Sequence, residues 1–457
     1  MRRLIKNQLQ ALLHYKNLYW RKRYTVNRIK LGDECTKFFH GMATISYRRN
    51  SISQILNDQG VWIHDHEGKA GLLWNSFRNR MGISANLPML FDLANLIAPV
   101  DGLQDLAEPF QQMEIDLIVK RMPTDKAPGP DGFNGLFMKK CWHIIRSDFY
   151  SFCNDFYLGS AHLECINTSF ITLVPKIDSP KSVSDYRPIS LMNSSPKLVT
   201  KILVDRLQSV IIGLIHHNQY GFIKTRTIQD CLAWSFEYIH QCHWSRRQAI
   251  ILKLDFEKAF DSIEHSVILQ VMEHLGFPTR WLNWVSSILG SGTSAVLLNG
   301  ILGKKFKCKR GVRQGDPLSP LLFVLAAELL QVLVNRAATM NMLKAPIPQP
   351  DDFPIVQYAD DTLLIMQADA RQLVFLKALL NSFSESTGLK VNYRKSQMLP
   401  INVPLDRMEC LANTFGYSVG TLPFTYLGLP MGTTKPCMED LTPMKDRIER
   451  RLSACST

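Results

Sequence analysis

The chain of 457 residues has ten cysteines but no C-x-x-C pair, and its first 45 residues contain no serine. Scattered cysteines predict neither a disulfide framework nor a zinc ribbon, and the missing serine argues against a transit peptide. Long apolar runs are also absent, because residues 318–334 are broken by Ser319, Glu328 and Gln331. We therefore expect an intracellular protein with reduced cysteines that does not enter a membrane.

Positive charge is abundant and unevenly distributed. The chain has 53 basic and 40 acidic residues, a net charge of +13, and residues 1–50 hold 12 Lys and Arg against Asp33 and Glu34. This basic arm indicates a polyanionic partner, most simply nucleic acid, although a solvated basic helix has the same composition. With 46% apolar residues, the chain can bury a large core, in two or three subdomains.

Residues 354–366, PIVQYADDTLLIM, have the pattern of a β-hairpin whose tight turn holds Asp360 and Asp361. Two adjacent carboxylates repel one another and are partly desolvated there, which raises their pKa values. A divalent cation removes this cost, because Mg²⁺ prefers hard oxygen ligands. From the hairpin alone, a metal site and a solvated Asp-Asp turn are equally good interpretations.

A second acidic strand end lies upstream, where residues 250–254 predict a buried strand followed by Asp255. A buried strand rarely ends in an unpaired carboxylate, so Asp255 and Asp360 together predict a two-cation site for in-line phosphoryl displacement. Asp261 and Glu264, in contrast, have the spacing of a capping box and predict a helix over residues 262–275.

Three further segments carry groups suited to anions. Two Gly and two Pro make KAPGPDG at residues 126–132 a shaped loop. Arg187 precedes a proline, and its extended backbone suits a grip on phosphate oxygens. Asp316, followed by a proline, predicts the N-cap of a long apolar helix with residues 311–315 at its N-terminus. Each segment alone is also explained by a structural loop, a surface ion pair or an ordinary helix cap.

Ten blocks in collinear order resemble the reverse transcriptases of non-LTR (long interspersed element) retrotransposons, most closely the plant members, over nearly the whole chain. The blocks are GDECTKFFH, KAPGPDGF, LVPK, DYRPISL, QYGFIKTRTIQD, KLDFEKAFDSI, GVRQGDPLSPLLF, YADD, GLKVNYRKS and YLGLPMG. The resemblance implies an α+β right-hand polymerase, with fingers, a palm of antiparallel strands backed by helices, and a helical thumb. It also implies a nuclear RNA-directed DNA polymerase that adds dNTPs to a primer 3′ end on an RNA template, by target-primed reverse transcription.

The resemblance further implies roles for individual residues. Asp255, Asp360, Asp361 and the backbone of Phe256 would hold two Mg²⁺ ions, for which Mn²⁺ is a substitute. Lys395, otherwise a surface turn lysine, would protonate the leaving pyrophosphate.

Phe260, otherwise a core residue, matches the steric gate that excludes a ribose 2′-hydroxyl. The other nucleotide-binding residues would be Lys176, Arg187, Gln314 and Gly315. The residues that contact template RNA or the DNA primer end would be Lys126, Gly129, Arg226, Arg313, Leu427 and Gly428, together with the basic N-terminal region.

The implied domains are a basic, helical, RNA-binding N-terminal extension at residues 1–104, fingers and palm at 105–435, and the start of a thumb at 436–457. Thr225 stands where the family usually has glycine, which is costly if that position needs a positive φ. Because the chain stops at Thr457, without the endonuclease domain and the Cys/His-rich segment of full-length relatives, we expect a fragment or degenerate copy. Three alternatives stay open: an inactive remnant that only binds RNA, a group II intron maturase, and a structural protein with fortuitous motifs.

Overall fold

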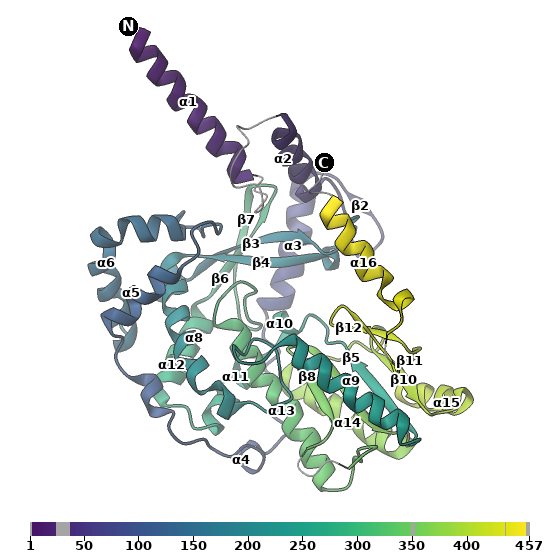
Figure 1. Cartoon of the computed structure of the whole chain (residues 1–457). Helices are drawn as coiled ribbons and strands as arrows, with labels where there is room; N and C mark the ends of the chain where they lie inside the picture. Colours follow the sequence, from purple (N-terminus) through teal and green to yellow (C-terminus); the bar gives the residue numbers. More distant parts are fainter. Residues whose placement is uncertain (1, 24–36, 349–351, 435, 454–457) are drawn as a thin grey trace. The chain divides into compact units, whose positions relative to one another are not determined.

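The computed structural model describes residues 2–23, 37–348, 352–434 and 436–453 (Figure 1). It contains two compact units, each built from three stretches of chain. Unit 1 comprises Met1–Ser76, Ile171–Ile189 and Ala295–Lys304, and unit 2 comprises Phe77–Phe170, Ser190–Ser294 and Lys305–Thr457. The boundaries expected near residues 104 and 435 concern functional domains and stay predictions. The first five residues of the GDECTKFFH block lie outside the described residues.

Unit 1 holds the N-terminal helices and most of a four-stranded sheet of order β4-β3-β6-β7. The elements that lie in it wholly or partly are α1 (Arg2–Arg23), α2 (Lys37–Asn50), β1 (Ile55–Leu56), β2 (Trp62–Ile63), α3 (His66–Met81), β3 (Thr168–Pro175), η2 (Val183–Asp185), β4 (Tyr186–Met192), β6 (Thr293–Leu298) and β7 (Ile301–Lys307). Asn299 exchanges two hydrogen bonds with the backbone of Ile52, at 2.9 and 3.0 Å. The buried Lys69 donates to the carbonyls of Ile52 and Ser53, so both carbonyls of the loop after α2 have a partner.

Unit 2 holds most of the helices and a five-stranded sheet. Its elements are α4 (Leu93–Leu96), η1 (Gln104–Ala107), α5 (Gln112–Arg121), α6 (Gly135–Leu158), α7 (Leu163–Ile166), α8 (Ser194–Leu214), α9 (Ile228–Trp244), β5 (Ala249–Leu254), α10 (Ala259–Ser262), α11 (His265–His274), α12 (Thr279–Ser291), α13 (Ser319–Thr339), β8 (Ile355–Tyr358), β9 (Asp361–Gln367), α14 (Ala370–Thr387), β10 (Gln397–Ile401), α15 (Leu405–Phe415), β11 (Ser418–Val419), β12 (Phe424–Tyr426), β13 (Leu429–Met431) and α16 (Met438–Ser453). The predicted hairpin and the predicted strand before Asp255 are both confirmed. The α+β expectation is confirmed as well.

The five-stranded sheet has the order β11-β10-β5-β9-β8, and all its pairs are antiparallel except β10 with β11. Both faces of its central strand are covered. Ile250, Leu252 and Leu254 join the core built with α8, α11, α13 and α14. Ala249 and Ile251 face the second core under α9, which Figure 1 draws across the sheet. Burial on both faces explains why β5 is apolar at nearly every position instead of alternating.

Helix α13 is the most buried long helix of unit 2. It is long and apolar enough to cross a membrane by length and composition, and 78% of its apolar window is buried inside the protein. Its 21 residues, Ser319–Thr339, extend past the apolar run of residues 318–334, and Glu328 and Gln331, which interrupt that run, are buried. Core helices of globular domains have the same composition.

Two predicted helix starts are wrong. Asp316 is not the N-cap of α13, which begins at Ser319 after Leu318; the Asp316 carboxylate accepts the Leu318 N–H at 3.0 Å. The predicted capping box does not form either, because Asp261 lies inside α10. The Glu264 carboxylate instead accepts from Ser84 and Ala85. In both cases a distant or tightly turned segment competes for the carboxylate, which local spacing does not reveal.

Candidate active site

Three carboxylates lie together where strands β5 and β8 end and strand β9 begins, in the five-stranded sheet. The register that pairs Leu254 with Thr362 puts Asp255 at the level of Asp361, the first residue of β9. Asp360 precedes it in the turn of the β8–β9 hairpin, where Tyr358 pairs with Asp361. Sheet pairing therefore joins two acidic segments that lie about a hundred residues apart in the chain.

The hairpin turn is strained. It consists of Ala359 and Asp360, and Ala359 has a φ of 58°. This left-handed conformation costs a residue with a Cβ about 1–2 kcal/mol, and it persists only where the surroundings impose it.

The carboxylates of the turn are destabilised as anions. Burial raises the pKa of Asp360, and the neighbouring Asp361 and Asp255 raise it further. Desolvation by the surrounding protein raises the pKa of Asp361 as well, although this residue is exposed at the surface; Lys253 opposes the effect, and Asp255 adds to it. Converging carboxylates whose charged forms are disfavoured are the donor set that a divalent cation stabilises, so these residues fit a metal site.

The Lys395 turn is hydrogen-bonded to the backbone of Asp255. The Asn392 N–H donates to the Asp255 carbonyl at 2.7 Å, and the Asp255 N–H donates to Ser396 Oγ at 3.1 Å. Lys395 is exposed within this turn. The GLKVNYRKS block is thus attached to the acidic strand end, which the sequence could not show.

The β12–β13 hairpin approaches the same carboxylates. Its turn residues Leu427 and Gly428 both have positive φ, at 47° and 89°, as a two-residue hairpin loop requires. The Tyr426 hydroxyl donates to the Asp361 carbonyl at 3.4 Å, and Lys253 Nζ donates to the Thr425 carbonyl at 2.9 Å. The predicted primer-contacting turn therefore belongs to a hairpin that is bonded to the acidic strands.

Phe260 lies partly exposed after the Asp255 strand. Its ring stacks on Phe323 of α13, with centroids 4.5 Å apart, and meets the edge of Phe222 at 6.1 Å. Phe256 is buried and pairs its backbone with Val391. Phe260 is thus both packed and accessible, as a residue that limits the size of a ligand must be.

Close backbone packing explains two of the predicted glycines. A Cβ on Gly129 would lie 2.0 Å from the Met192 carbonyl oxygen, and one on Gly315 would lie 2.6 Å from that of Ser190. The Gln314 carbonyl accepts the Ser190 N–H at 2.6 Å. Lys126, beside Gly129, is exposed.

Two predicted nucleic-acid contacts are occupied by internal bonds. The Arg313 side chain is 6% exposed and lies 3.7 Å from the Asp316 carboxylate. Arg226 donates to the carbonyls of Ile215, His216 and Gln219. In this structure the Arg313 guanidinium is buried beside a carboxylate and the half-buried Arg226 bonds to backbone carbonyls, so their contacts with nucleic acid stay predictions.

Lys176 and Arg187 both lie in unit 1. Lys176 Nζ donates to the Ser184 carbonyl at 2.8 Å, and Arg187 is exposed on β4.

Thr225 does not have a positive φ; Phe222 does, at 64°, so the expected strain at Thr225 is absent.

Four residues that contact the acidic segments had no site role of their own in the sequence-based prediction, although each lies in one of the ten blocks: Lys253, Ser396, Tyr426 and Gln219. Lys253 had a signal, since it is the single charged residue in an otherwise apolar strand. Gln219 had no signal beyond its place at the start of the QYGFIKTRTIQD block, because its contact with Ala359 spans 140 residues.

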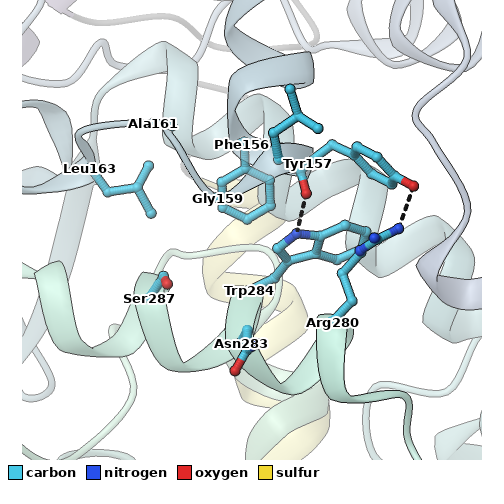
Figure 2. Close-up of a pocket in the computed structure, with 10 residues that line it drawn as sticks. Phe156, Tyr157, Gly159, Ala161, Leu163, Arg280, Asn283, Trp284 and Ser287 are labelled. Atoms are coloured by element: carbon cyan, nitrogen blue, oxygen red, sulfur yellow. Dashed lines mark hydrogen bonds between the residues drawn. The ribbon is translucent and has the colours of Figure 1, made fainter.

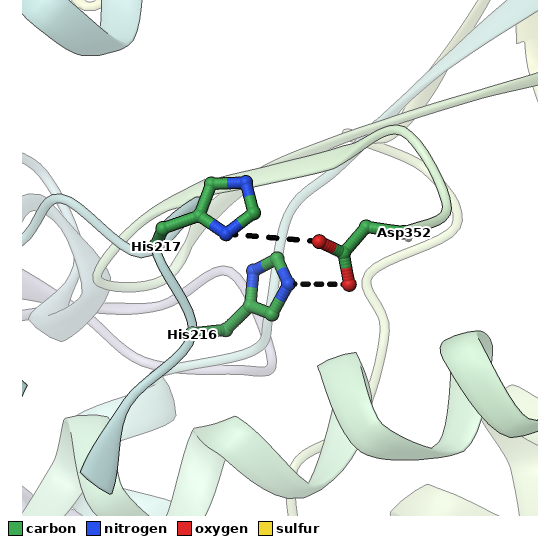
Figure 3. A group of neighbouring side chains, drawn as sticks. All are labelled: His216, His217 and Asp352. Carbon is green, nitrogen blue, oxygen red and sulfur yellow. Dashed lines mark ion pairs between the residues drawn. The ribbon is translucent and has the colours of Figure 1, made fainter. Parts of the chain in front are cut away.

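A second polar cluster lies in unit 2 (Figure 3). His216 Nε2 and His217 Nδ1 lie 2.7 and 3.6 Å from the two oxygens of Asp352, close enough to share a metal ion. However, the Asn218 N–H donates to His216 Nδ1 at 3.1 Å. Burial lowers the pKa of His216, and because Nδ1 accepts the Asn218 N–H, the neutral ring carries its proton on Nε2, which faces Asp352. A metal ion bound at Nε2 would have to displace this proton, so the cluster is described as two histidines at one carboxylate.

A cavity of about 230 Å³ lies between α6 and α12 (Figure 2). Arg280 stacks over the Tyr157 ring at 4.5 Å, and the Trp284 indole N–H donates to the Tyr157 carbonyl at 3.4 Å. Its ten lining residues include no carboxylate, histidine or cysteine, so it lacks the side chains that usually bind metal ions.

Residues 174–431, more than half of the chain, match the family model described as "Reverse transcriptase (RNA-dependent DNA polymerase)". The chain therefore belongs to the reverse transcriptase family. Within it, the relatives identify a reverse transcriptase domain of the non-LTR retrotransposon type, as the ten blocks predicted.

Three relatives illustrate this. The chain is 26% identical to the transposon TX1 149 kDa protein of Xenopus laevis, over 85% of this chain and 30% of that protein. It is 26% identical to the putative 115 kDa protein in the R1DM element of Drosophila melanogaster, over 96% and 40%. It is 24% identical to the RNA-directed DNA polymerase from mobile element jockey of the same organism, over 81% and 39%. The chain thus spans 30–40% of the length of these relatives. A telomerase structure from Candida albicans matches 66% of this chain and 49% of that chain, with 15% identity and a TM-score of 0.38.

Proposed function

We propose that this chain is an RNA-directed DNA polymerase that adds dNTPs to a primer 3′ end on an RNA template. One observation carries the proposal: sheet pairing brings Asp255, Asp360 and Asp361 together in a chain of the reverse transcriptase family. Target-primed synthesis, the nucleus as its location and a closer kinship with plant members stay predictions.

Asp255, Asp360, Asp361 and the Phe256 carbonyl would hold two Mg²⁺ ions, or Mn²⁺ in their place. When bound, such ions supply Lewis-acid stabilisation of the attacking and leaving oxygens of a phosphoryl transfer. The protein's own part is to hold the residues that would bind the ions in position. The Asn392 and Ser396 contacts fix the Asp255 backbone, and Lys253 neutralises part of the charge near Asp361.

The remaining predicted residues act on the substrates. Phe260 would close the pocket beside the sugar, because its ring is held by Phe323 and cannot easily turn away. Lys395 would donate a proton to the leaving pyrophosphate from the turn bonded to Asp255. Lys176, Arg187, Gln314 and Gly315 would bind the nucleotide, and Lys126, Gly129, Leu427 and Gly428 the primer–template.

Primer extension on an RNA template with dNTPs and Mg²⁺ tests the proposal. Asp360→Asn should abolish extension, whereas Asp148→Asn, a matched change at an exposed position of α6, should leave it intact. Extension that survives in Asp360→Asn would refute the assigned site. A wild-type chain that binds RNA with salt-dependent affinity but never extends a primer would be an RNA-binding remnant.

A further inference from the structure

The four residues 218–221 form a segment that lies along the outer edge of β8, the last strand in the order of the five-stranded sheet. Gln219 bridges Gln357 in parallel orientation. The Tyr220 N–H donates to the Gln357 carbonyl at 2.8 Å, and the Gln357 N–H donates to the Asn218 carbonyl at 2.9 Å. The segment thus covers the hairpin edge next to the acidic turn.

The Gln219 side chain reaches from this segment to the turn. It is fully buried, and its Oε1 accepts the N–H groups of Gly221 and Ala359, both at 2.9 Å. A Cβ on Gly221 would lie 2.4 Å from the Ala359 nitrogen, so only glycine permits this approach. Ala359 is the left-handed residue directly before Asp360.

The segment is also anchored independently of the turn. The His216 N–H donates to Glu328 of α13 at 2.9 Å, and Arg226 donates to the carbonyls of His216 and Gln219. The backbone around Gln219 is therefore held by contacts with Arg226 and Glu328 and not by the turn. Its side-chain amide can consequently act as a fixed support for the strained turn.

We propose that Gln219 is a positioning residue for the catalytic turn: its amide oxygen fixes the Ala359 N–H and thereby the direction in which Asp360 presents its carboxylate. The inference rests on the proposed function and adds the group that keeps the metal-binding turn in its strained conformation. Groups that orient metal ligands in this way typically contribute about 10–100-fold to metal affinity or activity.

The test compares three substitutions at Gln219 with one matched control. Gln219→Met keeps the volume but removes the acceptor, and Gln219→Asn withdraws the same oxygen by one methylene. Gln219→Glu keeps an acceptor oxygen. The control is Gln331→Met, an equally buried glutamine of α13 that does not contact the turn.

Two readouts are measured: the Mg²⁺ concentration that half-activates primer extension, with kcat and KM for dNTP, and Mn²⁺ affinity by electron paramagnetic resonance of free Mn²⁺. Gln219→Met and Gln219→Asn should each raise the Mg²⁺ requirement and weaken Mn²⁺ binding about tenfold, with KM for dNTP little changed. Gln219→Glu should recover most of both, and Gln331→Met should match wild type.

Wild-type Mn²⁺ affinity in both acceptor-deficient variants, or an equal loss in Gln331→Met, would overturn the inference. If Gln219→Met does not fold, Gln219→Asn decides. A wild-type chain that binds Mn²⁺ but extends no primer overturns the proposed function alone, since the Mn²⁺ titration still decides the role of Gln219. A wild-type chain that binds no Mn²⁺ overturns both.

Discussion

Replacing Glu328 with glutamine should make the free energy of unfolding much less dependent on pH. Glu328 lies in the buried helix α13, where one carboxylate oxygen accepts the His216 N–H and the other has no hydrogen-bond partner among the described residues. Burial raises the pKa of Glu328 from its ordinary value of 4.5 to about 8, although the His216 N–H and Arg226 oppose the shift.

The sign follows from proton binding. Between pH 4.5 and 8 the unfolded chain has released this proton while the folded chain still holds it, so stability falls as the pH rises through that window. The loss is about 1.4 kcal/mol per pH unit, hence about 3 kcal/mol at pH 7 and about 5 kcal/mol above pH 8. Below pH 4.5 both the folded and the unfolded chain hold the proton, so Glu328 costs no stability there.

Urea denaturation at pH 5, 7 and 9 checks this. The stability difference between Glu328→Gln and wild type should grow by about 4 kcal/mol from pH 5 to pH 9, since glutamine keeps the acceptor for His216 but does not titrate. Glu273→Gln, at an exposed position of α11, should show no such slope. Parallel pH profiles for Glu328→Gln and wild type would refute the reasoning, whatever the constant offset between them.

Three further outcomes are expected. Phe260→Val should raise kcat/KM for ribonucleotides relative to deoxynucleotides by about 10-fold or more, roughly 1.4 kcal/mol of discrimination, and an unchanged ratio would remove Phe260 from the sugar pocket. Gly129→Ala should destabilise the chain by about 1–3 kcal/mol in thermal denaturation, because its Cβ would clash with backbone. Gly213→Ala, in open space on α8, should stabilise it by about 0.5–1 kcal/mol, so equal midpoints would contradict the packing argument. Arg206→Lys should cost about 2–3 kcal/mol of unfolding free energy, since lysine cannot reproduce the paired 2.8 Å bonds to Glu114; a change below about 0.5 kcal/mol would argue against that geometry.

Local pattern was enough to predict the acidic hairpin and the strand that ends at Asp255. Each depends on apolar residues at strand spacing and on a turn or strand end that adjacent residues specify. The raised pKa values expected for Asp360 and Asp361 are also found; desolvation is the largest cause for both, and the adjacent Asp361 adds to it at Asp360. The family, too, was recognisable from the order of ten short blocks.

Residues whose role depends on a distant partner were beyond the sequence. Arg313 has the composition of a nucleic-acid contact, but folding buries it beside Asp316. Glu264 has the spacing of a helix cap, but its carboxylate is taken by a segment 180 residues away. Gln219 looks like an ordinary loop residue, and only its burial against Ala359 gives it a task.

The sequence by itself therefore determined which strands and turns carry the acids, because strand period and turn chemistry act over a few residues. The tertiary structure decided which side chains hold those acids in place. The hydrogen bond from Ala359 to Gln219 spans 140 residues and requires the native register of the sheet, which packing on both of its faces sets.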